Sequence, residues 1–472
     1  MDLRDKLYID GEWSPSADRN LLTVFGAADG KPLGSVPQGS VADVDRAVAA
    51  ARAAFEGWAA TPLRRRLELL ETLHAKLLEH REEIARIITG EVGMPLKLSR
   101  AIQAGLPAVT LEETIKLAKE YPFEQQLGNS LIIREAAGVV ACITPWNFPL
   151  HQLILKLAPA LTAGCTAVVK PSEEAPLSAF LLFDLIDACG FPPGVVNLIS
   201  GPGRPIGEAL AAHPAIDMIS FTGSTAAGRR ISELAAPTIK RVAMELGGKS
   251  ASILLDDAEL EAAVKGTVNS CFLNSGQTCS ALTRMLVPET RYAAVVEQTI
   301  RVAQTFSVGD PFAGQAKLGP LVSEKQQRRV RDYIQCGIDE GAELLLGGPE
   351  IPEDLPCGYY VKPTVFGRVT PDMTIAREEI FGPVLSILSY RDEDEAVNIA
   401  NDSPYGLSGA VWSRQRSRAE RIARRLRTGQ VDINGGRFNP LAPFGGYKQS
   451  GNGREMGSFG LEEFLELKSL QS

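Results

Sequence analysis

Several features are scarce in this 472-residue sequence, and each scarcity excludes a class of protein. The seven cysteines include no CxxC pair and are odd in number, so we expect neither a disulfide framework nor a metal site. Charge of one sign does not accumulate: 49 Lys and Arg stand against 57 Asp and Glu, giving a net charge of −8. This balance disfavours binding along a nucleic-acid backbone.

Long apolar runs are also missing. The most apolar stretch, residues 138–170, is interrupted by three prolines, an asparagine and a lysine, whereas a membrane-spanning helix needs about 20 mostly apolar residues. Residues 1–13 mix acidic and basic side chains and lack the apolar segment of a signal peptide. We therefore expect a cytoplasmic protein in a reducing compartment, with no membrane partner and with a core large enough for several domains.

The hydrophobic pattern changes from helical to alternating along the chain. Apolar residues in 40–55 recur at helical spacing, and Thr61 and Pro62 are predicted as the N-cap and first-turn proline of a second helix. From Gly138 onward, short apolar runs alternate with helical segments, and a second such series follows residue 250. This alternation is typical of βαβ units and parallel sheets. The predicted strands are 138–143, 166–170, 195–200, 217–221, 239–245, 251–255, 384–389 and 410–412.

Two glycine-rich segments resemble phosphate-binding loops without matching them. The segment 201–207 spaces its last glycine one residue too far for a dinucleotide fingerprint, and 223–228 is followed by two arginines where a P-loop has Lys and Ser or Thr. Residues 221–224 nevertheless end a predicted strand and open a helix, where free N–H groups could face a pyrophosphate. An ordinary strand-to-helix turn explains the same residues equally well.

Cys279 is the best candidate for a reactive side chain. It lies in the small, polar segment 274–280, which suits a loop better than a packed core, although most free cysteines are structural. A thiol nucleophile needs a base, and among the four histidines only His151 is a candidate. Glu245, at the end of an apolar strand and beside two glycines, is the carboxylate alternative.

Seven motifs taken together resemble the signature set of the aldehyde dehydrogenase superfamily. They occur in the expected order and at compatible spacings over nearly the whole chain, which is far more specific than any single motif. The motifs are TPWNFP at 144–149, KPSE at 170–173, FTGS at 221–224, ELGGK at 245–249, GQTC at 276–279, EIFGP at 379–383 and PFGGYK at 443–448.

The resemblance implies a role for each catalytic residue. Cys279 would attack the aldehyde carbonyl, and the Asn147 amide with the Cys279 backbone N–H would stabilise the oxyanion. Glu245 would act as the general base that activates water for hydrolysis of the thioester. The implied reaction is oxidation of an aldehyde to a carboxylic acid.

The resemblance further implies a nicotinamide cofactor, NAD by preference, with NADP possible. Lys170 and Glu173 would reach the adenosine ribose, Gly223 and Ser224 the pyrophosphate, and Glu379 the nicotinamide ribose. The carboxylate of Glu173 would repel a ribose 2′-phosphate, which favours NAD. The remaining predicted cofactor residues are Thr144, Pro145, Trp146, Ser172, Gly203, Gly207, Phe221, Thr222, Leu246, Gln326 and Phe381.

Fold and substrate site follow from the same resemblance. We expect an α/β protein with two parallel-sheet Rossmann-like domains and a small β element for oligomerisation, assembled as a homodimer or homotetramer. The implied ranges are 1–116 and 137–247 for the cofactor domain, 248–445 for the catalytic domain, and 117–136 and 446–472 for the β element. Residues expected to shape the substrate tunnel are Phe148, His151, Thr278, Ser280, Phe438 and Phe444.

Three alternatives were weighed against this reading. A CoA-acylating aldehyde dehydrogenase would pass the acyl group to a thiol, and the carboxylate of Glu245 argues against it. A hydrolase with a Cys279–His151 pair would not bind NAD. A non-catalytic use of the fold would be signalled by loss of Cys279, Asn147 or Glu245, and all three are present.

Overall fold

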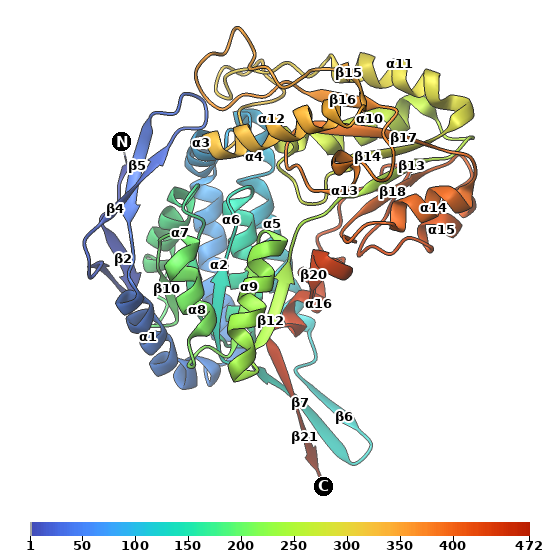
Figure 1. Ribbon diagram of the computed structural model, residues 1–472. Coiled ribbons are helices and arrows are strands. Elements are labelled where there is room, and N and C mark those ends of the chain that lie inside the picture. The colour runs from blue at the N-terminus through green and yellow to red at the C-terminus, as the bar shows by residue number, and fades with distance from the viewer. Residues whose placement is uncertain (1) are drawn as a thin grey trace.

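The computed structural model describes residues 2–472 and shows two lobes, each built on a largely parallel sheet (Figure 1). The first sheet has the order β20-β12-β11-β8-β9-β10-β2-β3, in which β12, β11, β8, β9 and β10 are parallel. Its strands are β2 (Lys6–Ile9), β3 (Glu12–Pro15), β8 (Val139–Ile143), β9 (Thr166–Lys170), β10 (Val196–Leu198), β11 (Met218–Thr222), β12 (Arg241–Glu245) and β20 (Gly451–Asn452).

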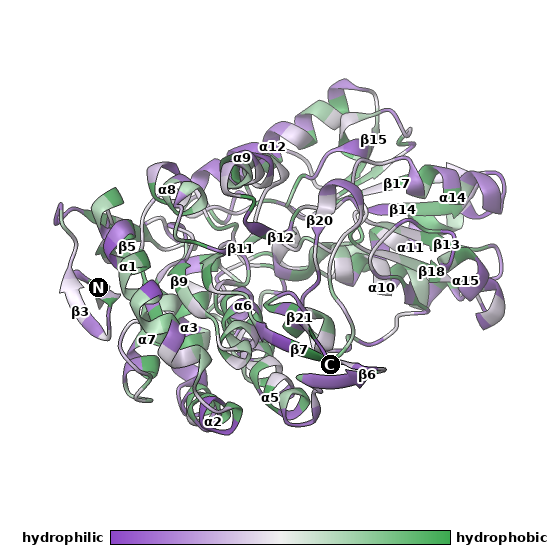
Figure 2. Ribbon diagram, turned by 90° about the horizontal axis from the view of Figure 1, so that it is seen from below, coloured by the Kyte–Doolittle hydropathy of each residue, from purple (hydrophilic) through white to green (hydrophobic). Residues whose placement is uncertain are grey.

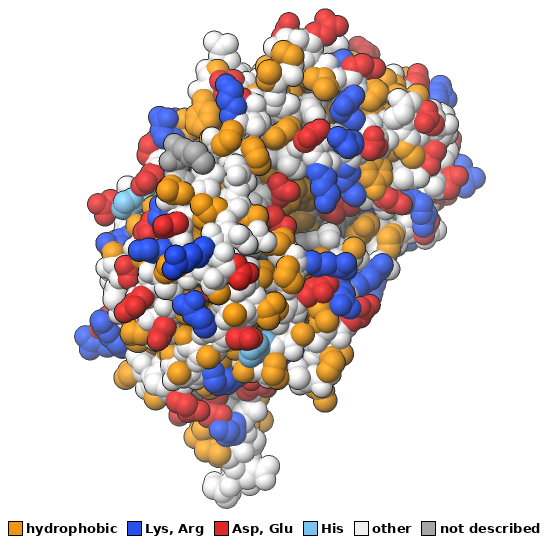
Figure 3. Space-filling view, turned by 60° about the vertical axis from the view of Figure 1, so that its left-hand side comes forward, with side chains coloured by type: hydrophobic (Ala, Val, Ile, Leu, Met, Phe, Trp, Pro, Cys, Tyr) orange, Lys and Arg blue, Asp and Glu red, His pale blue; other side chains and the backbone are white. Residues whose placement is uncertain are grey.

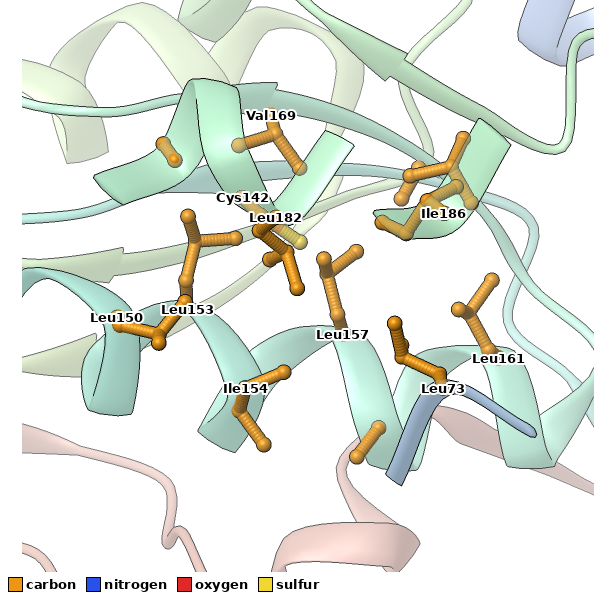
Figure 4. Packing of buried hydrophobic residues seen from close by; sticks show 14 of the residues in the cluster. Leu73, Cys142, Leu150, Leu153, Ile154, Leu157, Leu161, Val169, Leu182 and Ile186 are labelled. Atoms are coloured by element: carbon orange, nitrogen blue, oxygen red, sulfur yellow. The ribbon is translucent and has the colours of Figure 1, made fainter. Parts of the chain in front are cut away.

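One central helix, α6 (Pro149–Ala163), organises the first lobe. All of its residues are buried, because apolar side chains occupy every face of the helix. Its leucines and Ile154 meet Cys142 and Val169 of the sheet and Leu182 of a neighbouring helix (Figure 4). The other helices of this lobe are α1 (Val41–Ala59), α2 (Leu63–Glu79), α3 (Arg81–Val92), α4 (Leu96–Ala101), α5 (Gly105–Glu120), α7 (Leu177–Asp187), α8 (Glu208–Ala212) and α9 (Thr225–Ala235).

The second lobe contains a seven-stranded sheet in the order β15-β16-β17-β14-β13-β18-β19, parallel except for β15. Apolar residues of the strands lie inside this lobe, and polar residues lie toward the outside of its helices (Figure 2). The strands are β13 (Ala251–Leu254), β14 (Arg284–Pro288), β15 (Glu343–Leu346), β16 (Thr364–Gly367), β17 (Val384–Tyr390), β18 (Gly409–Trp412) and β19 (Asp432–Ile433). The helices are α10 (Leu260–Phe272), α11 (Tyr292–Ala303), α12 (Glu324–Asp339), α13 (Thr374–Arg377), α14 (Glu393–Asn401) and α15 (Arg416–Ala423).

A three-stranded antiparallel sheet projects from the body of the molecule (Figure 1). In it, β7 (Ser130–Ala136) pairs with β6 (Glu124–Leu127) on one side and with β21 (Leu465–Gln471) on the other. The short helix α16 (Gly457–Glu462) precedes β21, and a separate small sheet contains β1 (Asp2–Leu3), β4 (Leu21–Phe25) and β5 (Pro32–Pro37). No helix within residues 2–472 has the length and apolar character needed to cross a membrane.

These sheets confirm the predicted α/β class with two parallel-sheet units and a small β element. Each predicted strand is present with its ends shifted by two residues or fewer, and the first predicted helix is α1, capped by Ser40. The predicted start of the second helix is wrong. Pro62 occupies the N-cap position, and the Thr61 hydroxyl donates to Gly57 O at 2.9 Å instead of capping the helix.

Candidate active site

The parallel strands explain why distant motifs meet. The segments that follow β8, β11 and β12 begin at residues 144, 223 and 246, and all leave the carboxyl edge of the first sheet. Ligands of open α/β sheets bind at this edge. It faces a cleft of about 280 Å³, lined by Pro145, Trp146, Asn147, Gln152, Thr222, Gly223, Ser224, Leu246, Gly247, Cys279, Lys325, Gln326, Arg329, Glu379 and Phe381.

Cys279 reaches this cleft on a tightly folded loop. After α10, Asn274 and Ser275 adopt left-handed backbone angles, with φ of 53° and 55°, and Gly276 follows with φ of 76°. A Cβ on Gly276 would lie 2.1 Å from the backbone of Gly382, so only glycine allows this approach. The loop is therefore fixed against the second lobe before it presents the thiol.

Hydrogen bonds to the backbone carbonyl of Asn147 hold this residue beside the thiol. Its carbonyl accepts hydrogen bonds from Gln103 Nε2 at 2.8 Å and from Asn274 Nδ2 at 3.0 Å. Its side-chain Nδ2 donates to Gln277 O at 3.0 Å. The amide is thus oriented toward the loop that carries Cys279, and both residues line the same cleft.

The surroundings of Cys279 keep its thiol protonated. Burial, followed by the nearby carboxyl groups of Glu379, Glu245 and Glu455, raises the pKa of Cys279 to about 12. A thiol with this pKa is a poor nucleophile at neutral pH unless a base removes its proton.

Glu245 lies at the end of β12 with its carboxyl group facing a second, smaller cavity. That cavity has a volume of about 10 Å³ and is also lined by Lys156, Arg454 and Glu455, and the cleft containing Cys279 does not include Glu245. Neither carboxyl oxygen has a hydrogen-bond partner among residues 2–472. Burial, followed by the charge of Glu455, raises the pKa of Glu245 well above its usual value.

A buried ion pair adjoins Glu245 and was missed by the sequence analysis. Lys156 Nζ lies 2.6 Å from Glu455 Oε1 and also donates to Thr222 Oγ1 at 2.8 Å. Lys156 is only 1% exposed, so its charge must be compensated inside the protein. The sequence signal for this ion pair was a lysine in a helix that is otherwise mostly apolar.

Several predicted cofactor residues lie together in the cleft. Gln326 Nε2, on α12, donates to Phe381 O at 2.8 Å, and the rings of Phe381 and Trp146 meet edge to face with centroids 5.3 Å apart. Glu379 Oε1 accepts from Gly248 N–H at 3.0 Å, and burial raises the pKa of Glu379 to about 7.

The start of α9 completes this half of the cleft. Ser224 is its N-cap, with Oγ accepting from Ala227 N–H at 3.3 Å. A Cβ on Gly223 would lie 2.4 Å from the Phe221 ring, so glycine lets the backbone lie open to the cleft. The N-terminal end of a helix favours an anionic ligand.

Other predicted cofactor residues lie outside the residues that line the cleft. Lys170 is buried, Glu173 is partly exposed, and the two side chains lie 3.7 Å apart. A Cβ on Gly207 would lie 3.8 Å from Lys170 Cε, so these residues form a neighbouring group. The set not lining the cleft consists of Thr144, Lys170, Ser172, Glu173, Gly203, Gly207 and Phe221.

The predicted substrate residues are spread over different environments. Phe444 packs with Leu155, Leu407 and Met456 in an apolar cluster that Cys279 contacts. His151 is buried, its Nε2 lies 3.1 Å from Thr110 Oγ1, and burial lowers its pKa to about 4. Phe148 is buried, Thr278 and Ser280 flank Cys279 half-buried, and Phe438 is 53% exposed. Of these six residues none lines the cleft.

Four cleft residues were not predicted from the sequence: Gln152, Gly247, Lys325 and Arg329. Gln152 lies in the first turn of α6, shortly after Asn147, but the sequence alone does not show which polar residue of that turn faces the cleft. Lys325 and Arg329 are neighbours of Gln326 on α12, but nothing in that helical sequence distinguishes them from solvent-exposed cations. Gly247 is one of the two glycines that follow Glu245, and a glycine carries no side chain that would mark it as part of a binding site.

Comparison with known proteins shows which family this chain is similar to. Residues 13–470 match the model of the aldehyde dehydrogenase family. A Pseudomonas protein named 3-succinoylsemialdehyde-pyridine dehydrogenase is 50% identical over 98% of both chains. A Pseudomonas syringae aldehyde dehydrogenase, crystallised with NAD⁺ and octanal, is 48% identical, covers 99% of this chain and 96% of its own, and has a TM-score of 0.98.

A Mycobacterium tuberculosis aldehyde dehydrogenase, crystallised with NAD⁺, shows the same similarity at greater distance. It is 41% identical, with coverage of 100% of this chain and 98% of its own and a TM-score of 0.97. These matches extend over both lobes of the chain. The chain belongs to the aldehyde dehydrogenase family of enzymes.

Proposed function

We propose that this enzyme oxidises a small-molecule aldehyde to a carboxylate with NAD, through a covalent intermediate on Cys279. The observation that carries the proposal is one cleft that contains a thiol, an oriented amide and the N-terminal end of α9. Relatives crystallised with NAD⁺ support the cofactor, and the one that also contains octanal supports an aldehyde substrate.

The residues of the cleft fit a dinucleotide. Gly223 and Ser224 would place the start of α9 against its pyrophosphate, and Glu379 would accept hydrogen bonds from the nicotinamide ribose. Lys170 and Glu173, in the neighbouring group, would meet the adenosine ribose. NAD, when bound, accepts the hydride released by the substrate, and NADP is the less favoured alternative because Glu173 is acidic.

Cys279 and Asn147 would carry out the first half of the reaction. After its proton has passed to the carboxylate of Glu245, Cys279 Sγ attacks the carbonyl carbon and forms a thiohemiacetal. The Asn147 amide and the Cys279 backbone N–H donate to the developing oxyanion, and such donors are effective because they are already oriented. Gln103 and Asn274 hold Asn147 in that orientation. Loss of hydride then leaves a thioester on Cys279.

Glu245 would carry out the second half. A raised pKa suits a general base at neutral pH, because the carboxylate is basic enough to accept a proton from water. Its side chain rotates from the small cavity toward the cleft to reach the thioester. In its position in the small cavity the carboxyl group requires glycine at 445, because a Cβ there would lie 2.6 Å from Glu245 Oε1.

The rival mechanisms receive less support. A CoA-acylating reaction has no need of a buried base that activates water, and Glu245 supplies one. A Cys–His hydrolase would need His151 beside the thiol, but His151 is bonded to Thr110 and is not among the residues of the cleft.

The projecting sheet supports a proposal about assembly. Among residues 2–472, its edge strand β21 pairs with β7 alone, and Leu467 and Leu470 on that strand are exposed. An open edge with exposed leucines suits pairing with a second copy, so we propose a homodimer or homotetramer. On the face shown in Figure 3, acidic and basic side chains are mixed, so that face offers no continuous basic surface to a nucleic acid. Seven free cysteines support a reducing, cytoplasmic location.

The direct test is NADH formation with a panel of aliphatic, aromatic and carboxylate-bearing aldehydes, with NAD and NADP compared for each. We expect NADH and the corresponding acid in equal amounts, with no requirement for CoA and with NAD preferred. A CoA requirement would replace the proposal with the acylating alternative. No turnover with any aldehyde, despite NAD binding, would reject it.

A further inference from the structure

Gln152 is a buried polar side chain that the proposed chemistry leaves unused. It lies in the first turn of α6 and lines the cleft together with Asn147 and Cys279. Its side chain is 6% exposed, and its Oε1 has no hydrogen-bond partner in the described part of the chain. A buried acceptor without a partner destabilises a protein, so a ligand that supplies one gains affinity there.

The surroundings of the thiol restrict what that ligand can be. On one side, Leu155, Leu407, Phe444 and Met456 form the apolar cluster that Cys279 contacts. The carboxyl groups of Glu245, Glu379 and Glu455 act on the same thiol. A substrate bound beside the thiol therefore meets apolar side chains and carboxyl groups, and a second carboxylate on it would gain no cationic partner from them.

The cations of the cleft do not remove this restriction. Lys325 and Arg329 lie on α12 with Gln326, whose amide holds the carbonyl of Phe381 in the half of the cleft assigned to the cofactor. Arg329 Nη2 itself donates to Glu379 O at 2.7 Å. Gln152 is on α6, in the other lobe, and its amide is neutral. It therefore selects for hydrogen bonding and not for charge.

We infer that Gln152 determines specificity for neutral aldehydes whose apolar chain carries a hydroxyl group, which can donate a hydrogen bond to Gln152 Oε1. This inference rests on the proposed function, because it concerns the substrate of the same reaction. A hydroxyl can donate to Oε1, whereas a ketone can only accept and leaves Oε1 without a partner. Gln152 acts on binding of the substrate chain, and the chemistry at Cys279 remains as described.

The test compares octanal with hydroxyoctanals and oxooctanals in which the polar group is moved along the chain. For the unaltered enzyme we expect a higher kcat/KM for at least one hydroxyoctanal than for octanal or for the oxooctanal substituted at the same carbon. In Gln152→Leu, which keeps the volume and removes the amide, this preference should fall about tenfold, the size of one hydrogen bond. Octanal has no group that bonds to the amide, so it is the reference substrate and the ratio of the two kcat/KM values is the readout.

Control variants separate recognition from folding. Gln327→Leu removes an equally buried amide that donates to Tyr360 O outside the cleft, and it should leave the polar-to-apolar ratio unchanged. Gln152→Met tests the same loss with a second side chain, and NAD binding reports an intact fold. A carboxylate-bearing aldehyde of equal length should be a poor substrate for all variants.

Two outcomes separate a failure of the role given to Gln152 from a failure of the proposed function. Equal ratios in the unaltered enzyme and Gln152→Leu, with octanal still oxidised, would overturn the role of Gln152 and leave the proposed function standing. Failure of the unaltered enzyme to oxidise any of these aldehydes would overturn both.

Discussion

At the scale of the residue, the main question is how a thiol with a raised pKa becomes a nucleophile. Cys279 is surrounded by carboxyl groups and by apolar side chains, and both favour its protonated form. The same surroundings raise the pKa of Glu245, the group proposed to accept protons. The pKa values of the Cys279 thiol and of the Glu245 carboxyl are thus both raised. Catalysis should therefore depend on the pH at which Glu245 ionises.

The first prediction concerns the nucleophile. Cys279→Ala should abolish aldehyde oxidation, because no thiohemiacetal can form, while NAD binding persists because the proposed cofactor contacts lie elsewhere in the cleft. Steady-state NADH formation and NAD titration by fluorescence measure the two properties. Cys271→Ala, at a buried cysteine next to the same loop, is the control and should retain turnover. Substantial oxidation by Cys279→Ala would reject the assignment.

The second prediction concerns the base. Glu245→Gln should still form up to one equivalent of NADH but should then stall, because no base activates water. General-base assistance is typically worth about 10²–10⁴-fold, so steady-state turnover should fall by that order. An acyl adduct on Cys279 should be visible by intact mass spectrometry. Normal deacylation in this variant would show that another group activates water.

The third prediction is the pH dependence of the same step. The carboxyl of Glu245 must be ionised to accept a proton, and its pKa is raised, so kcat should still increase with pH above the range in which an ordinary glutamate ionises and then level off. Rapid-mixing measurement of deacylation from pH 5 to 9 would give this profile. In Glu245→Gln the rising limb should disappear, and a limb that persists would belong to a different group.

At the scale of the element, the loop before Cys279 is built around one glycine. Gly276→Ala should destabilise the protein, because φ of 76° is strained for alanine and its Cβ would meet the Gly382 backbone at 2.1 Å. Gly314→Ala is a matched control, with φ of 78° and no atom within 4 Å. We expect about 1–2 kcal/mol of lost stability in the control and a larger loss, with lower kcat, in Gly276→Ala. Urea unfolding and kinetics measure both.

The elements themselves were largely predictable, and the site was predictable only in part. The strand-to-helix segments that carry Asn147 and Ser224, and the strand end at Glu245, follow from hydrophobic alternation, because the ends of parallel strands share one edge of a sheet. Gln152, Lys156 and Glu455 could not be placed, since a single sequence does not reveal which polar residue of a buried helix faces a cleft and which pairs with a residue about 300 positions away. The inward position of the Glu245 side chain was likewise beyond a sequence pattern.

At the scale of the whole molecule, the projecting sheet offers the remaining test. The double substitution Leu467→Glu and Leu470→Glu should shift the protein toward monomers, because it places charge on the open edge formed by β21. Light scattering after size-exclusion chromatography measures the mass. Leu3→Glu, at an exposed leucine 64% accessible on a different sheet, should leave the mass unchanged. An unaltered mass in the double variant would place the interface elsewhere.

The pairing of β20 with β12 has a consequence for how the protein is made. One side of β12 pairs with β11, and on the other side Met244 and Glu245 pair with Asn452 and Gly451 of β20. A ribosome adds about 5–20 residues per second, so the roughly 200 intervening residues keep this edge open for about 10–40 s. Throughout that time the strand that bears the proposed base can pair with another nascent chain. Translation that pauses before residue 451 should therefore increase aggregation, and slower synthesis would harm the yield of this enzyme more than its stability suggests.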